Sequence, residues 1–323
     1  MTQITSSEWQ ELLSESPYSN AFQTEEMYNF LSSLGCVYSF LSCVRNAEGK
    51  LVGLAVGYIQ AEKGIKKYFS RRAIIQGGLL LAKNIAEGEL KTLLEDIKHK
   101  TSSAIYVEIR NNADYSQYKE VFEKYGFDYR PHLNCLIDCS NAEQALKNMN
   151  ESRRRQVRIA TEAEYEVKMA ETSAEVDDFY SLLSNHYKTK VKKPIFPREF
   201  FTEIVSQKVG EIMLIKINSK VVSGMLQLLH GNTVYDYYVF GLDTQYPNNY
   251  PSVLVYWETI KRASALGYTT FDTMGAGSPG QAYGVRDFKL RFGSRLVEHG
   301  RFLSINKPLL YKLGTLAIRL IAR

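Results

Sequence analysis

Apolar and polar positions predict nearly the same series of elements twice along the chain. In the first half we expect a β-hairpin, a strand, a helix, a strand, a second helix and a last strand, at residues 38–44 and 51–60, 73–81, 87–100, 104–109, 116–125 and 133–138. In the second half three antiparallel strands precede a helix, which opens at Pro251 and ends at Gly267, and a short strand. These strands are expected at residues 211–217, 221–229, 232–240 and 269–272.

The repetition predicts an internal duplication and an α+β fold, with two tandem, mostly antiparallel sheets flanked by helices. A strongly helical stretch at 142–164 links the two halves. We expect domains at 1–142 and 143–305, followed by a helix at 306–323. The length of 323 residues agrees with two domains, because about 150 residues per domain is usual.

Composition is that of a globular protein, with 45% hydrophobic and 23% charged residues. No stretch approaches the roughly 20 apolar residues that cross a bilayer, and the first ten residues do not resemble a signal peptide. The four cysteines form no CxxC pair, which predicts free thiols in a reducing cytoplasm.

Charge is distributed unevenly. Residues 1–146 hold 15 Lys and Arg against 18 Asp and Glu, whereas residues 147–323 hold 25 against 17. The cationic second half indicates contact with an anion such as a phosphate, a nucleotide, an RNA backbone or an acidic lipid surface. Ordinary solvated surface charge is the alternative.

Two basic segments carry candidate binding residues. A predicted helix at 147–160 places two arginines on one face, and planar guanidinium groups suit bidentate phosphate recognition. A basic, aromatic segment at 186–198 contains two prolines, which predict an irregular loop over an anionic or sugar substrate. A solvated surface is the alternative for both. The candidates are Arg153, Arg154 and Arg158 in the first segment, and Tyr187, Lys190 and Lys192 in the second.

A glycine-rich segment supplies the remaining candidates. Residues 275–280 spell GxGxxG, but no parallel βαβ unit surrounds them, so we reject a dinucleotide site. We expect a strand ending at Asp272, a mobile loop, and a strand at 288–292 with Lys289 and Arg291 on one face. Such a lysine would stabilise an oxyanion or a phosphate. The candidate substrate-binding residues here are Gly275, Gly277, Tyr283, Arg286 and Arg291. The five histidines lack ligand spacing, so no metal site is predicted.

Three sequence blocks in this order resemble the FemABX peptidyltransferases and the related CelD-like acyltransferases. Residues 153–160, 257–263 and 288–293 read RRRQVRIA, WETIKRA and FKLRFG. The resemblance implies two tandem GNAT-like domains and transfer of an activated acyl group to an amine. In the FemABX branch the group is an amino acid from aminoacyl-tRNA, and the acceptor is a peptidoglycan precursor. No tightly bound cofactor is implied.

Matching position implies that Lys289 lies near the reacting carbonyl and that Asp272 is the strand-end acid. Asp272 would orient the amine or accept its proton, with capping of a turn as the alternative. The GNAT turn that binds pyrophosphate through backbone amides usually contains two glycines. Residues 245–252 contain two prolines and neither glycine, which favours aminoacyl-tRNA over acyl-CoA as the donor.

The last segment predicts a basic amphipathic helix. Leu309, Leu313, Leu316 and Leu320 form its apolar stripe, and Lys312, Arg319 and Arg323 lie elsewhere. The stripe either packs on the second domain or docks on a membrane surface, where a lipid-linked acceptor would be reached.

The sequence therefore predicts a cytoplasmic acyl- or aminoacyltransferase that forms an amide on a UDP-sugar-linked or lipid-linked cell-envelope precursor. Two alternatives stay open. One is an acyl-CoA-dependent N-acyltransferase that acts on an amino sugar in polysaccharide synthesis. The other is a non-catalytic GNAT-like module that binds RNA or glycan.

Overall fold

The computed structural model describes residues 4–60 and 70–321, and the side chains up to residue 316. The chain forms two compact units, Met1–His132 with Glu298–Arg323, and Leu133–Val297. The described residues contain one seven-stranded sheet for each unit. Three members of the predicted C-terminal helix, Leu320 of its stripe and the cations Arg319 and Arg323, lie outside the residues or side chains described, as do residues 1–3.

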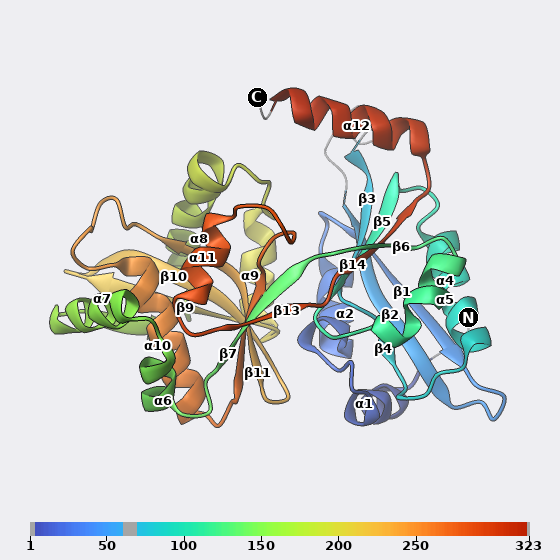
Figure 1. Ribbon diagram of the computed structural model, residues 1–323, viewed down its shortest axis with the longest axis horizontal. Helices are drawn as coiled ribbons and strands as arrows, with labels where there is room; N and C mark the ends of the chain where they lie inside the picture. The colour runs from blue at the N-terminus through green and yellow to red at the C-terminus, as the bar shows by residue number, and fades with distance from the viewer. Residues whose placement is uncertain (1–3, 61–69, 322–323) are drawn as a thin grey trace. The chain divides into compact units, whose positions relative to one another are not determined.

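Unit 1 is a sheet with helices on both faces (Figure 1). Its strand order is β1-β2-β3-β5-β14-β6, with β4 paired to β2. The strands are β1 (Tyr38–Arg45), β2 (Leu51–Gln60), β3 (Arg72–Gly77), β4 (Leu80–Leu81), β5 (Tyr106–Asn111), β6 (Asp128–Arg130) and β14 (Arg301–Ile305). The helices are α1 (Ser6–Glu15), α2 (Glu25–Ser33), α4 (Glu87–Lys100), α5 (Lys119–Lys124) and α12 (Pro308–Ile321), with 3-10 turns η1 (Ala21–Gln23) and η3 (Ser116–Tyr118).

The continuous apolar run of β2 explains this layering. Residues 51–59 are all buried, as expected for a strand that is covered on both faces. The antiparallel pairs β1-β2 and β2-β3 lead to a parallel pair, β3-β5, which extends over six residues from Arg72↔Tyr106 to Gly77↔Asn111. The predicted strand at 73–81 is divided into β3 and β4 because Gly77 and Gly78 have positive φ.

Unit 2 repeats the plan in the strand order β13-β7-β12-β11-β10-β9-β8. The strands are β7 (Leu133–Asp138), β8 (Glu166–Met169), β9 (Glu211–Ile217), β10 (Lys220–His230), β11 (Thr233–Gly241), β12 (Thr270–Gly275) and β13 (Arg295–Glu298). The helices are α6 (Ala142–Asn148), α7 (Glu151–Glu162), α8 (Ser173–His186), α9 (Arg198–Ser206), α10 (Pro251–Ala265) and α11 (Gly284–Leu290), and α8 continues into the π-helical turn η4 (Tyr187–Val191).

The two sheets confirm the predicted fold class. In each, three antiparallel strands are followed by one parallel neighbour and then by an antiparallel strand. That last strand is β14 in unit 1 and β7 in unit 2. It comes from the other half of the sequence in both cases.

The predicted strand at 288–292 is wrong, because these residues belong to α11 and the turn after it. Phe288 and Phe292 are four residues apart, a spacing that fits one face of a strand and also one face of a helix. Lys289 is buried, whereas Leu290 is exposed. Lys289 and Arg291 therefore do not share an open sheet face.

Candidate active site

The site of interest in unit 2 lies where the parallel strands β11 and β12 stop pairing. They pair over three residues, from Thr233↔Thr270 to Tyr235↔Asp272. Directly afterwards the register of β11 against β10 shifts, since Gln227 pairs with Asp236 and Leu226 with Tyr238. This places one extra residue, Tyr237, in β11. A bulge bends a strand and re-aims its side chains, which is consistent with β11 leaving β12 at this point.

Two buried carboxylates mark the end of the pairing. Burial raises the pKa of Asp272 to about 7, against the hydrogen bond from the Met274 amide at 2.7 Å and the charge of Lys289. Burial also raises the pKa of Asp236 to about 6, although Lys289 and the hydroxyl of Tyr256, which donates to Asp236, oppose the shift. Both carboxylates can therefore exchange protons near neutral pH.

Helix α11 supplies the cation of this cluster. Lys289 is 5% exposed, and its ammonium donates to the carbonyl oxygens of Thr273 and of Gly275, the latter at 3.0 Å. Burial lowers the pKa of Lys289, while the charge of Asp236 acts in the opposite direction. An ammonium carries three N–H donors, so two carbonyl bonds leave one donor for a ligand.

The glycine loop between β12 and α11 is held from within. Arg286 donates to the carbonyl oxygens of Ser278, at 3.0 Å, and of Gln281. Gly277 has φ +80°, and a Cβ there would lie 2.9 Å from the Tyr283 ring. The structure thus gives Arg286 a positioning contact within the loop. Burial raises the pKa of Tyr187, and the charge of Asp236 adds to the shift, so Tyr187 lies near this cluster.

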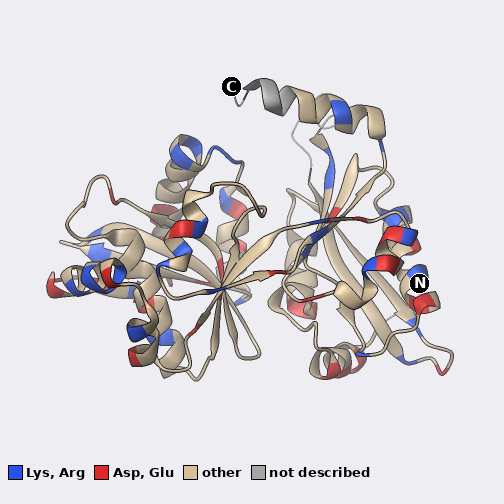
Figure 2. Cartoon of the chain, viewed as in Figure 1, with Lys and Arg blue, Asp and Glu red and all other residues tan. Residues whose placement is uncertain are grey.

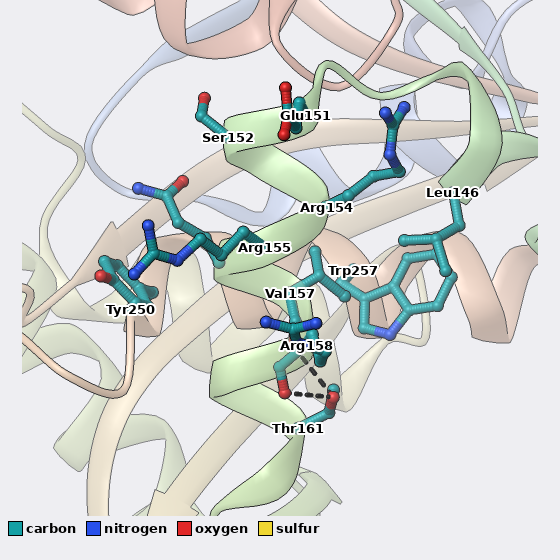
Figure 3. Close-up of a pocket in the computed structure, with 11 residues that line it drawn as sticks. Leu146, Glu151, Ser152, Arg154, Arg155, Val157, Arg158, Thr161, Tyr250 and Trp257 are labelled. Atoms are coloured by element: carbon teal, nitrogen blue, oxygen red, sulfur yellow. Dashed lines mark hydrogen bonds between the residues drawn. The ribbon is translucent and has the colours of Figure 1, made fainter.

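The arginine segment forms a separate hollow on α7. Its volume is about 920 Å³, and its lining includes Arg154, Arg155, Arg158, Tyr250 and Trp257 (Figure 3). Arg154 donates to the carbonyl oxygens of Lys147, at 3.0 Å, and of Met149, so it also caps α6. Figure 2 shows Lys and Arg distributed along α7. The hollow is therefore cationic with an aromatic wall.

Arg153 does not line this hollow. It is 2% exposed, its guanidinium lies 4.3 Å from the ring centroids of both Phe288 and Phe292, and it donates to the Phe288 carbonyl oxygen at 3.2 Å. Burial lowers its pKa to about 10. Arg153 thus connects α7 to α11, the helix that carries Lys289.

The other predicted residues are dispersed. Lys190 lines a smaller hollow of about 240 Å³ and donates to the Thr244 hydroxyl at 3.1 Å. Lys192 and Arg291 are exposed. Within the described residues, no group of His, Cys, Asp or Glu side chains is arranged to hold a metal ion.

The first turn of α10 is occupied by a carboxylate. The Ser252 amide donates to Asp243 at 3.0 Å, and the Ser252 hydroxyl also donates to Asp243. The amides of Val253 and Leu254 donate to the Tyr250 carbonyl oxygen, and Pro251 has no N–H. At Gly241 a Cβ would lie 2.7 Å from the Ser252 nitrogen, so the end of β11 closely approaches this turn.

Sequence reasoning missed Asp236, Tyr256 and Asp243. Asp236 carries a signal that could have identified it, since it is a charged residue inside the apolar run 234–240. Its partner Tyr256 lies 20 residues away on α10, and the bulge that aims Asp236 results from strand pairing. No local pattern marks either feature.

Comparison with known proteins agrees with this geometry. Residues 147–289 match the family model described as an acetyltransferase (GNAT) domain. None of the curated proteins compared with the chain matches it. The crystal structure of FemX is similar with a TM-score of 0.73 and 16% identity, covering 97% of this chain and 98% of that one.

Two further structures share the fold. L-PGS from Bacillus licheniformis gives a TM-score of 0.57 at 14% identity, covering 98% of this chain and 97% of that one. A tandem GNAT protein from the clavulanic acid biosynthesis pathway gives 0.57 at 10% identity, with coverages of 94% and 95%. The family match over residues 147–289 and the two repeated sheets give this chain a GNAT-like fold in two tandem units.

Proposed function

We propose that this protein transfers an aminoacyl group from aminoacyl-tRNA to an amine of a cell-envelope precursor and forms an amide. The observation that carries the proposal is the cluster of Asp236, Asp272 and Lys289 at the end of the β11-β12 pairing, inside the residues that match the GNAT family. The resemblance of three sequence blocks to the FemABX peptidyltransferases, together with the fold shared with FemX, supports an envelope-related acceptor.

The reaction needs a neutral amine and a stabilised oxyanion. The amine attacks the ester carbonyl, the C–N bond forms, and the C–O bond to the ribose breaks. Asp272 takes the proton from the attacking nitrogen, and this proton then passes to the departing ribose oxygen. The third N–H of Lys289 stabilises the oxyanion, a contribution typically worth about 100- to 1,000-fold in rate. Asp236 lies near the charge of Lys289, and Tyr187 lies near Asp236, so both are proposed to position these groups.

The N-terminus of α10 argues against a conventional acyl-CoA site. In GNAT acyl-CoA enzymes this turn offers free amides to pyrophosphate. Here the Ser252 amide is bonded to the Asp243 carboxylate, and the next two amides are bonded to the Tyr250 carbonyl oxygen. A pyrophosphate that bound to this turn would have to displace the Asp243 carboxylate against the repulsion between the two negative charges. The arrangement favours a carrier that is bound elsewhere.

The cationic hollow on α7 suits such a carrier. Arg155 and Arg158 line it together with the rings of Tyr250 and Trp257. Guanidinium groups with aromatic rings bind the phosphates and bases of nucleic acids. We assign this hollow to the tRNA, and the β11-β12 split to the aminoacyl ester. Tyr187, Lys190 and Lys192 are proposed to contact the acceptor.

A donor screen tests the proposal. The purified protein receives charged tRNA or acyl-CoA separately, with a pool of muropeptides and UDP-amino sugars, and labelled amide is quantified. We expect product with charged tRNA alone. Product with acyl-CoA at an equal rate would show the donor assignment to be wrong. Salt-sensitive tRNA binding with no product from either donor would identify a non-catalytic module instead.

The matching family is described as an acetyltransferase domain, which favours acyl-CoA as the donor in one competing function. In that function we take an amino sugar as the acceptor. The Asp243→Asn variant separates the two, because it removes the charge and keeps an acceptor for the Ser252 amide. We expect the variant to bind CoA several-fold more tightly and to keep its tRNA-dependent rate. Asp177→Asn, at a surface ion pair with Arg198, is the matched control. Tight CoA binding by the unmodified protein would favour the competing function.

A further inference from the structure

Helix α12 leaves a row of leucines uncovered. Leu309, Leu313 and Leu316 are 78%, 62% and 55% exposed. Residues at i, i+4 and i+7 lie on one face of a helix, so the three side chains form one apolar stripe. Single exposed leucines are common on protein surfaces, but a contiguous stripe indicates an interaction surface.

The opposite side of α12 is attached to unit 1. The Asn306 side chain donates to the Thr101 carbonyl oxygen at 2.9 Å, and Lys307 donates to the Ser103 carbonyl oxygen at 3.1 Å. The ring of Tyr311 meets that of Tyr106 edge to face, with centroids 5.5 Å apart. Tyr311 is two residues from both Leu309 and Leu313, which places it on the far side of the helix. The stripe therefore points away from the sheet to which α12 is attached.

Charge indicates what covers the stripe. The sequence from residue 299 to 323 contains no Asp or Glu. Lys312 is exposed beside the leucines, and Lys307 lies at the start of the helix. An apolar stripe bordered only by cations matches the acyl boundary and the anionic headgroups of a lipid surface.

We propose that α12 docks this protein on the surface of an anionic bilayer. The helix lies in the interface, with Leu309, Leu313 and Leu316 among the acyl chains and Lys312 at the headgroups. Within the described residues, no helix is long and apolar enough to cross a bilayer, which fits a helix that lies flat. The inference depends on unit 1 and holds whichever donor unit 2 uses.

Vesicle binding by the full chain tests the proposal without any acyl transfer. The protein is sedimented with vesicles of phosphatidylcholine, with or without phosphatidylglycerol. We expect binding to the anionic vesicles that weakens with salt. The variant Leu309→Gln/Leu313→Gln/Leu316→Gln should bind at least ~100-fold more weakly, because each leucine loses its burial in the acyl boundary. Leu266→Gln/Leu296→Gln, at exposed leucines outside α12, is the control and should bind normally.

A charge variant keeps the test decisive if the triple variant misfolds. Lys312→Glu changes two units of charge beside the stripe and should weaken binding roughly 30-fold, at about 1 kcal/mol for each charge. Unchanged binding of either folded variant to anionic vesicles would overturn the proposal. Absence of vesicle binding by the unmodified protein would also overturn it. If that protein instead formed a dimer that the triple variant dissociates, a second copy would cover the stripe.

Discussion

The two sheets of this protein treat a buried carboxylate in opposite ways. Glu108 and Asp272 lie on corresponding strands, β5 and β12, each the parallel neighbour in its sheet. Glu108 forms ion pairs with Arg110 at 2.7 Å and Arg301 at 2.9 Å, and these outweigh burial, so its pKa falls to about 2. Burial dominates at Asp272 and raises its pKa to about 7. One carboxylate stays ionised, and the other is ready to exchange a proton.

The two units also differ in how far their parallel strands stay paired. In unit 1 the parallel strands stay paired over six residues, and in unit 2 they pair over three before the bulge in β11. Unit 1 therefore has a closed sheet with a neutralised charge, whereas unit 2 has an open sheet with polar groups at the opening. Under the proposed function, the duplicated fold keeps unit 1 as scaffold and uses unit 2 for chemistry.

The largest expected effect concerns which strands each unit needs. We predict that residues 133–297 expressed alone fold cooperatively, whereas residues 143–305 do not. The second fragment lacks β7, which pairs with β12 and contributes the buried Cys135 and Ile137. Thermal unfolding followed by circular dichroism distinguishes the two fragments. A sharp transition for 143–305 would mean that β7 is dispensable to unit 2.

The second prediction compares one substitution in each of the two charged clusters. Lys289→Met should lower the transfer rate about 100-fold or more through loss of oxyanion stabilisation. Glu108→Gln should leave that rate unchanged and lower the free energy of unfolding by about 3 kcal/mol, because two arginines lose their partner. Single-turnover transfer and urea unfolding measure the two quantities. If Glu108→Gln abolished transfer in a folded protein, unit 1 could not be regarded as scaffold alone.

The third prediction concerns pH, because the carboxylates of the two clusters titrate in different ranges. The proposed mechanism requires ionised Asp272, so the rate should rise with pH and level off as pH passes the range of about 6 to 7 in which this carboxylate and Asp236 titrate. Asp272→Asn should remove that limb together with most of the activity.

Stability should respond at lower pH. The pKa of Glu108 is about 2 in the folded protein against an ordinary 4.5, so its contribution is complete above pH 4.5 and is lost as pH falls toward 2. Glu108→Gln should flatten this loss in urea unfolding measured at a series of pH values. An unchanged profile would show that other carboxylates govern the acid limb.

Local signals were sufficient for much of the fold. The helix predicted at 87–100 is α4, and the strands predicted at 133–138 and 211–217 are β7 and β9. Each of these elements has a clear hydrophobic period or an adjacent turn, and both signals depend only on residues that are close together in sequence. Local signals failed at α11, where two phenylalanines four residues apart satisfied either period. Both pack against Tyr256 of α10, a contact that the local pattern does not show.

The sequence proposed Asp272 and Lys289 as site residues from their matching positions. In the structure Lys289 donates to the carbonyl oxygens of Thr273 and Gly275, which follow Asp272 in β12. Arg153 and Arg154 looked equivalent in sequence, but one stacks on Phe288 and the other borders the hollow. Helical rotation separates neighbouring residues by about 100°, and only the packing partner shows which direction is buried.

The sequence by itself determined the duplication, the mixed α+β plan and the cationic character of the second half, because these depend on local periods and on composition. Tertiary structure alone decided that β7 and β14 join sheets formed by the other half of the chain, and that Asp236 meets Tyr256 beside Lys289. These are contacts between residues far apart in sequence, and they arise from strand pairing and burial that no short segment encodes. The pKa values near neutrality follow from the same burial.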